Sequence, residues 1–202
     1  FSKTFLVKSG SNEYAMKICK SDSECSNVTE GNEAHQKLQT LIDAEPERDL
    51  KHENFYIVKL FGHGIVSRVA SENKLEINKS VFYIEDKKDI NKIKKIINIF
   101  FQIAQALKFI HDNGFIHFDI KLENVILLNY NKKPDPDSVK VRLIDFDSLK
   151  TTSEVQSNPS DFGTLGYKAP EVRKPKKNSQ TKKLDIFSFG ILILYLISDK
   201  KN

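Results

Sequence analysis

The 202-residue chain contains no tryptophan, one methionine, two cysteines, six prolines and eight glycines. Cys19 and Cys25 stand in a polar segment without further metal-ligating partners, so we expect neither a zinc site nor a disulfide framework. A reduced intracellular setting, the cytoplasm, is the corresponding expectation. No signal peptide is recognisable at the start. The longest apolar stretch, 186–197, is shorter than the roughly 20 residues that span a bilayer, so it predicts a buried helix and no membrane span.

The chain has only a small excess of positive charge, with 32 Lys and Arg residues against 27 Asp and Glu residues. Part of the excess comes from the lysines at 174–183, which accompany Pro175 and Asn178. No aromatic residues interleave with these lysines, so we expect a solvated loop and no nucleic-acid partner. Hydrophobic residues make up 39% of the chain, enough for a core in one large domain or in two small lobes that share a cleft.

The first part of the chain reads as strand-rich. Residues 5–7 and 14–18 flank a Ser-Gly-Ser-Asn turn at 9–12 and predict a β-hairpin. A helix is expected at about 29–42. Two further strands are expected at 57–65 and 81–85.

The second part reads as helical. Apolar residues recur with a 3.6-residue period from Ile93 to Ile110, including Ile97 and Ala104, and Asn113-Gly114 follows as a helix stop. Strands are expected at 125–128 and 139–144, and a closing helix at 184–197. The change of character near residue 86 predicts an N-terminal part, 1–86, and a C-terminal part, 87–202, in an α+β fold.

Two polar stretches that follow or precede apolar runs carry the chemistry. Asp119, Lys121 and Asn124 place a carboxylate, an ammonium and an amide within six positions. A second acidic triplet, residues 145–147, follows another apolar run about twenty residues on. This composition suits a metal-bound phosphate better than a core, because hard cations take oxygen ligands. The two loops are expected to face one site.

These stretches resemble the catalytic loop, H-R-D-x-K-x-x-N, and the D-F-G triplet of eukaryotic-type protein kinases. Further matches follow in order along nearly the whole chain. They are 14–17 (Tyr-Ala-Met-Lys, like V-A-I-K), 50–60 (like L-x-H-P-N-I-V-x-L with two residues inserted), 163–171 (like the segment that seats the acceptor residue) and 185–190 (like D-x-W-S-x-G). The resemblance implies a bilobal fold, with a small antiparallel β lobe that holds one helix and a mainly α-helical large lobe.

The resemblance also implies a protein serine/threonine kinase that uses ATP and Mg²⁺ and acts on a protein substrate. Asp119 would orient the substrate hydroxyl, and Lys121 would neutralise charge on the transferred group. Asn124 and Asp145 would bind Mg²⁺. Lys17 would hold the α- and β-phosphates of ATP.

The remaining implied residues surround the nucleotide and the acceptor. Glu33 is the first choice for the carboxylate that orients Lys17, and Glu30, one turn earlier, is the rival. Thr164 together with Lys121 matches the pattern of kinases directed at serine and threonine. The residues implied around the adenine are Ala15 above the ring, Ile126 below it, Ile84 at the back of the pocket and the hinge at 85–87, which begins with Glu85.

Two residues of these motifs have implied structural roles. His117 could serve as a metal ligand or a base, but the resemblance favours packing of its ring against Phe146. Asp185 would hold the backbone of the catalytic loop rather than touch substrate.

The chain departs from the family pattern at several positions. Phe118 replaces the Arg that clamps a phosphate on the activation segment, and Phe cannot form such charge-assisted bonds. We therefore hypothesise that activity does not require phosphorylation of the segment's hydroxyl residues, Thr151, Thr152, Ser153, Ser157 and Ser160. Asp147 replaces a Gly and should restrict switching of the triplet.

The ends of the resemblance are incomplete. Residues 1–5 align with only the second half of a glycine-rich phosphate loop, and the match stops after the helix at 184–197. A clipped or minimal kinase domain is the expectation, and a catalytically impaired kinase-like binding or regulatory module is the alternative. A small-molecule kinase is disfavoured by the 163–171 segment.

Overall fold

The computed structural model describes residues 3–9, 12–18, 30, 33–41, 44, 66–67, 90–128, 139–159, 161–173 and 181–197. Several expectations lie outside these residues: the strands at 57–65 and 81–85, the hinge at 85–87 and most of the lysine-rich loop. Ile84, Glu85, Ser160 and both cysteines lie outside them as well.

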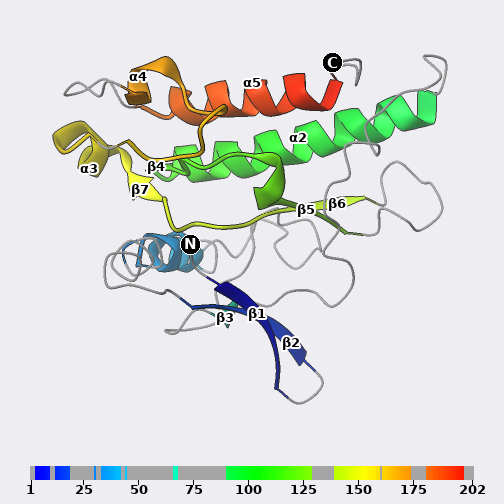
Figure 1. Ribbon diagram of the computed structural model, residues 1–202, viewed down its shortest axis with the longest axis horizontal. Helices are drawn as coiled ribbons and strands as arrows, with labels where there is room; N and C mark the ends of the chain where they lie inside the picture. The colour runs from blue at the N-terminus through cyan, green and yellow to red at the C-terminus, as the bar shows by residue number, and fades with distance from the viewer. Residues whose placement is uncertain are drawn as a thin grey trace.

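The predicted N-terminal hairpin is confirmed. β1 (Lys3–Ser9) pairs antiparallel with β2 (Asn12–Ile18), in a register that runs from Lys3 opposite Ile18 to Ser9 opposite Asn12. β3 (Val66–Ser67) pairs with β2, so the sheet order among the described residues is β1-β2-β3. The sheet lies at the opposite side of the molecule from the long helices (Figure 1).

The predicted first helix is present at 33–41, where Leu38 is fully buried. α2 (Ile90–Asp112) begins three residues before the predicted start at Ile93 and ends at Asn113-Gly114 as predicted, where Gly114 has φ 80. Some apolar positions on the predicted 3.6-residue period are not buried, since Ile97 is 60% exposed and Ala104 is exposed. The buried stripe is instead Ile96, Ile99, Ile103, Ala106, Leu107 and Ile110, with Gln102 and Phe109 beside it.

The strands that follow α2 bring the two polar loops together. β5 (Val125–Leu128) pairs antiparallel with β6 (Lys140–Leu143), which confirms both predicted strands. The short helix η2 (Leu122–Asn124) leads directly into β5, and the backbone N–H of Ile144 donates to the Asn124 carbonyl (3.0 Å). The ends of both polar loops are thereby joined. A second pair, β4 (Phe115–Ile116) with β7 (Lys150–Thr151), was not predicted.

The helices that follow in the described part of the chain are α3 (Thr152–Ser157), α4 (Pro170–Arg173) and α5 (Lys183–Ile197). The closing helix was predicted. It lies beside α2 (Figure 1), and the Phe100 and Phe189 rings meet edge to face at 6.3 Å.

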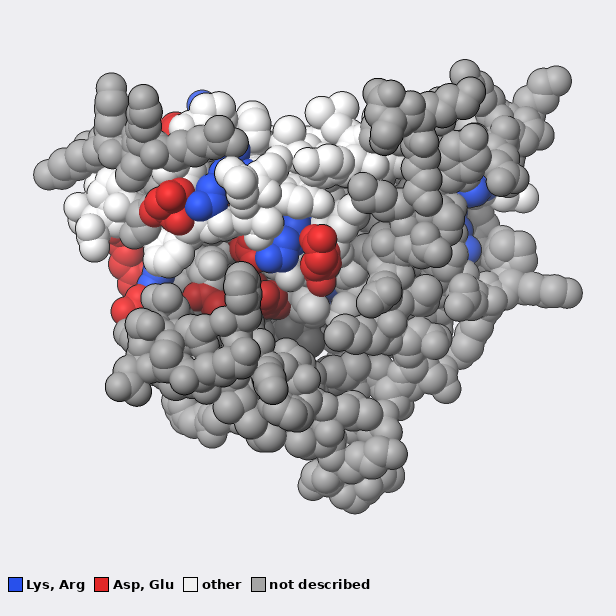
Figure 2. Space-filling view, in the orientation of Figure 1, with Lys and Arg blue, Asp and Glu red and all other residues white. Residues whose placement is uncertain are grey.

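The predicted burial of this helix is confirmed for only one face of α5. Leu184, Leu192 and Leu196 are buried, whereas its other face exposes large apolar side chains: Ile186, Phe187, Leu194, Tyr195 and Ile197. No helix in the described part of the chain is long and apolar enough to cross a membrane. On the face shown in Figure 2, several of the described basic side chains lie next to acidic ones.

Candidate active site

The loop after β4 is fixed by a buried carboxylate from α5. Asp185, which is fully buried, accepts the backbone N–H of His117 (2.8 Å) on Oδ2 and that of Phe118 (2.9 Å) on Oδ1. Its Oδ2 also lies 2.8 Å from His111 Nε2. Charge-assisted bonds of this kind are stronger than neutral ones, so the expected backbone-holding contacts of Asp185 are confirmed.

Two non-glycine residues in the site have positive φ, Phe118 (φ 67) and Asp145 (φ 64). Such conformations cost about 1–3 kcal/mol each and persist where surrounding contacts enforce them. Each of these residues adjoins one of the predicted functional loops, since Phe118 precedes Asp119 and Asp145 opens the acidic triplet. The unusual backbone therefore coincides with the residues that the sequence singled out.

Asp119 is the centre of a compact polar cluster. Lys121 Nζ donates to Asp119 Oδ2 (2.7 Å), and Thr164 Oγ1 donates to Asp119 Oδ1 (2.7 Å). Lys121 Nζ also donates to Thr164 Oγ1 (2.8 Å), which closes a triangle of three side chains. Asn124 Nδ2 donates to the Asp119 carbonyl (2.7 Å) and to its Oδ2 (3.1 Å). Four residues predicted from the sequence are thus brought together.

The surroundings of Asp119 set its charge state. Burial raises the pKa of the Asp119 carboxyl, but hydrogen bonds from Lys121 and Thr164 and the charges of Lys121 and His117 lower it by more. The net pKa lies below the ordinary value, because the donors stabilise the ionised form. Asp119 is therefore an oriented carboxylate at neutral pH.

The acidic triplet is held from two sides. The Phe146 ring lies between two imidazoles, stacked on His35 at 4.2 Å and tilted against His117 at 4.9 Å. The second contact confirms the packing expected of His117, whose Nε2 also lies 3.2 Å from the Ile144 carbonyl. Sequence reasoning missed His35. The only signal available in the sequence was a histidine in the predicted helix at 29–42, four residues before another buried position.

The segment at 163–171 is attached to the same site and to α5. Thr164 reaches Asp119 as described above, and Ser188 Oγ donates to the Tyr167 carbonyl (2.9 Å). Tyr167 is partly buried and Ser188 is buried. The expected acceptor-seating segment thus lies against the predicted catalytic loop.

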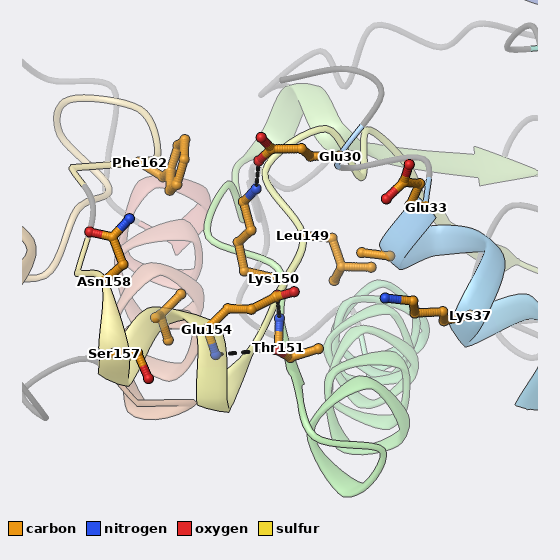
Figure 3. A pocket seen from close by; sticks show the side chains of 12 residues that line it. Glu30, Glu33, Lys37, Leu149, Lys150, Thr151, Glu154, Ser157, Asn158 and Phe162 are labelled. Atoms are coloured by element: carbon orange, nitrogen blue, oxygen red, sulfur yellow. Dashed lines mark hydrogen bonds and ion pairs between the residues drawn. The ribbon is translucent and has the colours of Figure 1, made fainter. Parts of the chain in front are cut away.

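The structure describes the residues predicted to bind the nucleotide only in part. Lys17 and Ala15 lie on β2, opposite Thr4 and Leu6 of β1, and only their backbone is described. Ile126 is half-buried on β5, and Glu33 is exposed on the helix at 33–41. The rival carboxylate, Glu30, forms an ion pair with Lys150 of β7, which the sequence did not predict (Figure 3).

The side-chain oxygens near Asp119 are of the type that binds a magnesium–phosphate group. Asn124 is 3% exposed, and its amide nitrogen donates hydrogen bonds to Asp119. Its amide oxygen therefore faces away from that carboxylate. Among the described residues, no group of three or more His, Cys, Asp and Glu side chains could hold a metal alone. Mg²⁺ characteristically binds one or two carboxylates together with substrate phosphates and water. Asn124 and Asp145 would be such partial ligands.

Comparison with known proteins gives a consistent assignment. The sequence pattern of the protein kinase domain matches residues 1–202. A solved kinase domain superposes with a TM-score of 0.65 at 18% identity, covering 97% of this chain and 60% of that chain. This likeness confirms the predicted α+β, bilobal kinase-like fold.

Several curated relatives are protein kinases by description. "Probable serine/threonine-protein kinase gdt2" of Dictyostelium discoideum is 34% identical over 138 residues, 68% of this chain and 8% of that protein. "Cysteine-rich receptor-like protein kinase 1" of Arabidopsis thaliana is 33% identical over 127 residues, 60% of this chain and 19% of the relative. "Calcium/calmodulin-dependent protein kinase type 1" of Caenorhabditis elegans is 39% identical over 100 residues, 50% of this chain and 26% of the relative. The chain thus spans a minor part of each relative.

Proposed function

Because this chain belongs to the protein kinase domain family, we propose that it transfers the γ-phosphate of ATP to a serine or threonine hydroxyl of a protein substrate. The triangle formed by Asp119, Lys121 and Thr164 carries the proposal. It combines an ionised acceptor for a hydroxyl proton, a cation beside it and a hydroxyl that fixes both. A loop with a purely structural role has no physical need for this arrangement.

Phosphoryl transfer depends on positioning and on electrostatic stabilisation. Asp119 accepts the hydrogen bond of the substrate hydroxyl and aims its oxygen at the γ-phosphorus. The lowered pKa of Asp119 favours this orienting role, because the carboxylate is ionised before substrate arrives. Lys121 stabilises the charge that develops on the transferred group, in a partly buried setting where such a contact counts for more than in water.

The nucleotide is proposed to bind between residues 1–86 and residues 87–202. Lys17 holds its α- and β-phosphates. Asn124 and Asp145 would hold Mg²⁺, which would supply charge neutralisation at the phosphate oxygens. Glu33 orients Lys17, a choice supported by the engagement of Glu30 with Lys150. The adenine lies between two apolar side chains and against the hinge, with the residues Ala15, Ile126, Ile84 and Glu85 around it.

The proposal is tested by measuring γ-phosphate transfer to a generic Ser/Thr protein substrate in the full-length protein. Asp145→Asn and Lys17→Met serve as inactive references, since the first weakens metal binding and the second removes the phosphate contact. We expect transfer by the wild type well above both variants. Transfer no greater than that of the variants, together with retained partner binding, would instead support a kinase-like binding module.

A further inference from the structure

The residue that replaces the phosphate-clamping Arg is built into an apolar cluster. Phe118 is 5% exposed and packs in a cluster with residues from β4, the segment after the triplet, α4 and α5. Its members are Ile116, Phe118, Val155, Ala169, Val172 and Leu184, with the half-buried Phe162 packed against them. The catalytic loop thus meets the 149–172 segment through apolar contacts.

Phe162 and Gly163 both lie against Phe118. The Phe118 and Phe162 rings meet edge to face with centroids 5.9 Å apart, a favoured geometry for aromatic pairs. At the next residue, a Cβ added to Gly163 would lie 2.4 Å from the Phe118 carbonyl oxygen, and Gly163 has φ 96. Both the side chain and the backbone of Phe118 are therefore covered by residues 162–163.

Lys150 connects this contact to the helix at 33–41 and the residues before it. Its ammonium lies 5.6 Å from the centroid of the Phe162 ring, within cation–π range, and forms an ion pair with Glu30. The Lys150 side chain is 14% exposed. Figure 3 shows Glu30, Lys150 and Phe162 among the residues that line a cavity of about 550 Å³, with the Lys150 ammonium directed to Glu30.

We propose that Phe162 and Lys150 are positioning residues which, with Phe118, hold the 150–163 segment against the catalytic loop without a bound phosphate. The edge-to-face ring pair supplies the contact that a phosphate and an Arg would otherwise make. Lys150 closes the arrangement by holding the Phe162 ring and Glu30 at once. The consequence for catalysis rests on the proposed kinase function, whereas the structural role of the three residues does not.

The test uses Phe162→Ala, Phe162→Leu and Lys150→Met in the full-length protein. Phe162→Leu keeps an apolar side chain without the ring, and Lys150→Met keeps the stem without the charge. Matched controls are Phe101→Ala and Lys108→Met, which change an exposed Phe and an exposed, ion-paired Lys on α2. Amide hydrogen exchange of residues 117–120 and 150–169 is measured first, and kcat and KM for Mg-ATP second.

We expect faster exchange in both segments for all three test variants and wild-type exchange for both controls. In the kinetic arm, kcat falls by roughly tenfold to a hundredfold while KM for Mg-ATP stays within about twofold, because only acceptor-side geometry is disturbed. If Phe162→Ala fails to fold, Phe162→Leu and Lys150→Met decide. Exchange in these two variants equal to that of the wild type overturns the proposal. Absence of transfer by the wild type overturns the proposed kinase function alone. The hydrogen-exchange results then test the structural role of the three residues by themselves.

Discussion

At the scale of single residues, the charge of Asp119 depends on its two side-chain donors. Its pKa is lowered by Lys121 and Thr164 against the opposing effect of burial. A depressed pKa means that the ionised form stabilises the fold above the ordinary carboxyl pKa of about 3.9, and that this stability is lost as the pH falls through the folded value.

Removing one donor should therefore raise the pKa of Asp119. We expect a carboxyl ¹³C titration of Asp119 to show a higher midpoint in Lys121→Met than in the wild type, since burial would then be less opposed. Lys108→Met, on the exposed surface of α2, should leave the midpoint unchanged. Equal Asp119 midpoints in wild type and Lys121→Met would contradict this reading of the cluster.

Asp185 gives a second prediction at this scale. Asp185→Ala leaves the buried backbone N–H groups of His117 and Phe118 without their carboxylate acceptor. We expect a loss of about 2–6 kcal/mol in the free energy of unfolding, since each of the two unsatisfied buried donors costs about 1–3 kcal/mol. Urea unfolding measures it, with Asp112→Ala as the control because Asp112 lies in an exposed ion pair. A midpoint for Asp185→Ala equal to that of the control would show that the backbone is held by something else.

At the scale of elements, α3 depends on its cap. Thr151 accepts from the backbone N–H of Glu154, and the Glu154 carboxylate accepts from the backbone N–H of Thr151, forming a capping box. The pKa of Glu154 is lowered because the Thr151 hydrogen bonds and the charges of Lys37 and Lys150 outweigh its partial burial. The T-x-x-E spacing was readable in the sequence and would have predicted the start of α3.

Loss of the cap should open α3 locally. Thr151→Ala is expected to destabilise this six-residue helix by about 1 kcal/mol and to speed cleavage after Glu154 by a Glu-specific protease. Thr151→Ser keeps the hydroxyl and should be cleaved at nearly the wild-type rate. Cleavage of Thr151→Ala no faster than that of Thr151→Ser would show that packing of Val155 alone maintains the helix.

The longer elements could be predicted from the sequence because their signals are local. The β1–β2 hairpin, the helix at 33–41, α2, the strand pair β5–β6 and α5 all follow from periodicity and turn residues. The buried face of α2 did not follow, because apolar residues surround much of this helix and only packing selects one stripe. The pair β4–β7 has two residues in each strand and no period, so its formation depends on tertiary contacts.

At the scale of the whole molecule, the motifs predicted which distant residues would meet. Thr164 is far from Asp119 in sequence, yet the two side chains form a hydrogen bond, as the order of the motifs implied. The contacts that the sequence did not predict are His35 against Phe146, Lys150 with Glu30, and Phe162 against Phe118. Each pair includes a residue outside the matched motifs, so the motif spacing did not indicate the contact.

The replacement of Arg by Phe118 predicts activity that does not require phosphorylation of the segment. Phosphatase treatment of the full-length protein, with mass spectrometry confirming unmodified residues at 150–160, should leave most of the activity. The buried Phe118 offers no cation to a phosphate, and Lys150 is already paired with Glu30. Loss of most activity on treatment, restored by rephosphorylation, would refute this prediction.

Asp119, Lys121 and Thr164 are proposed to orient an aliphatic hydroxyl for phosphoryl transfer. The most direct measurement is ³²P transfer from γ-labelled ATP to three peptides that differ only in a Ser, Thr or Tyr acceptor, by wild type and Asp119→Asn. We predict incorporation into the Ser and Thr peptides by the wild type and its loss in the variant. Transfer mainly to Tyr, or Ser and Thr transfer undiminished in Asp119→Asn, would contradict the account.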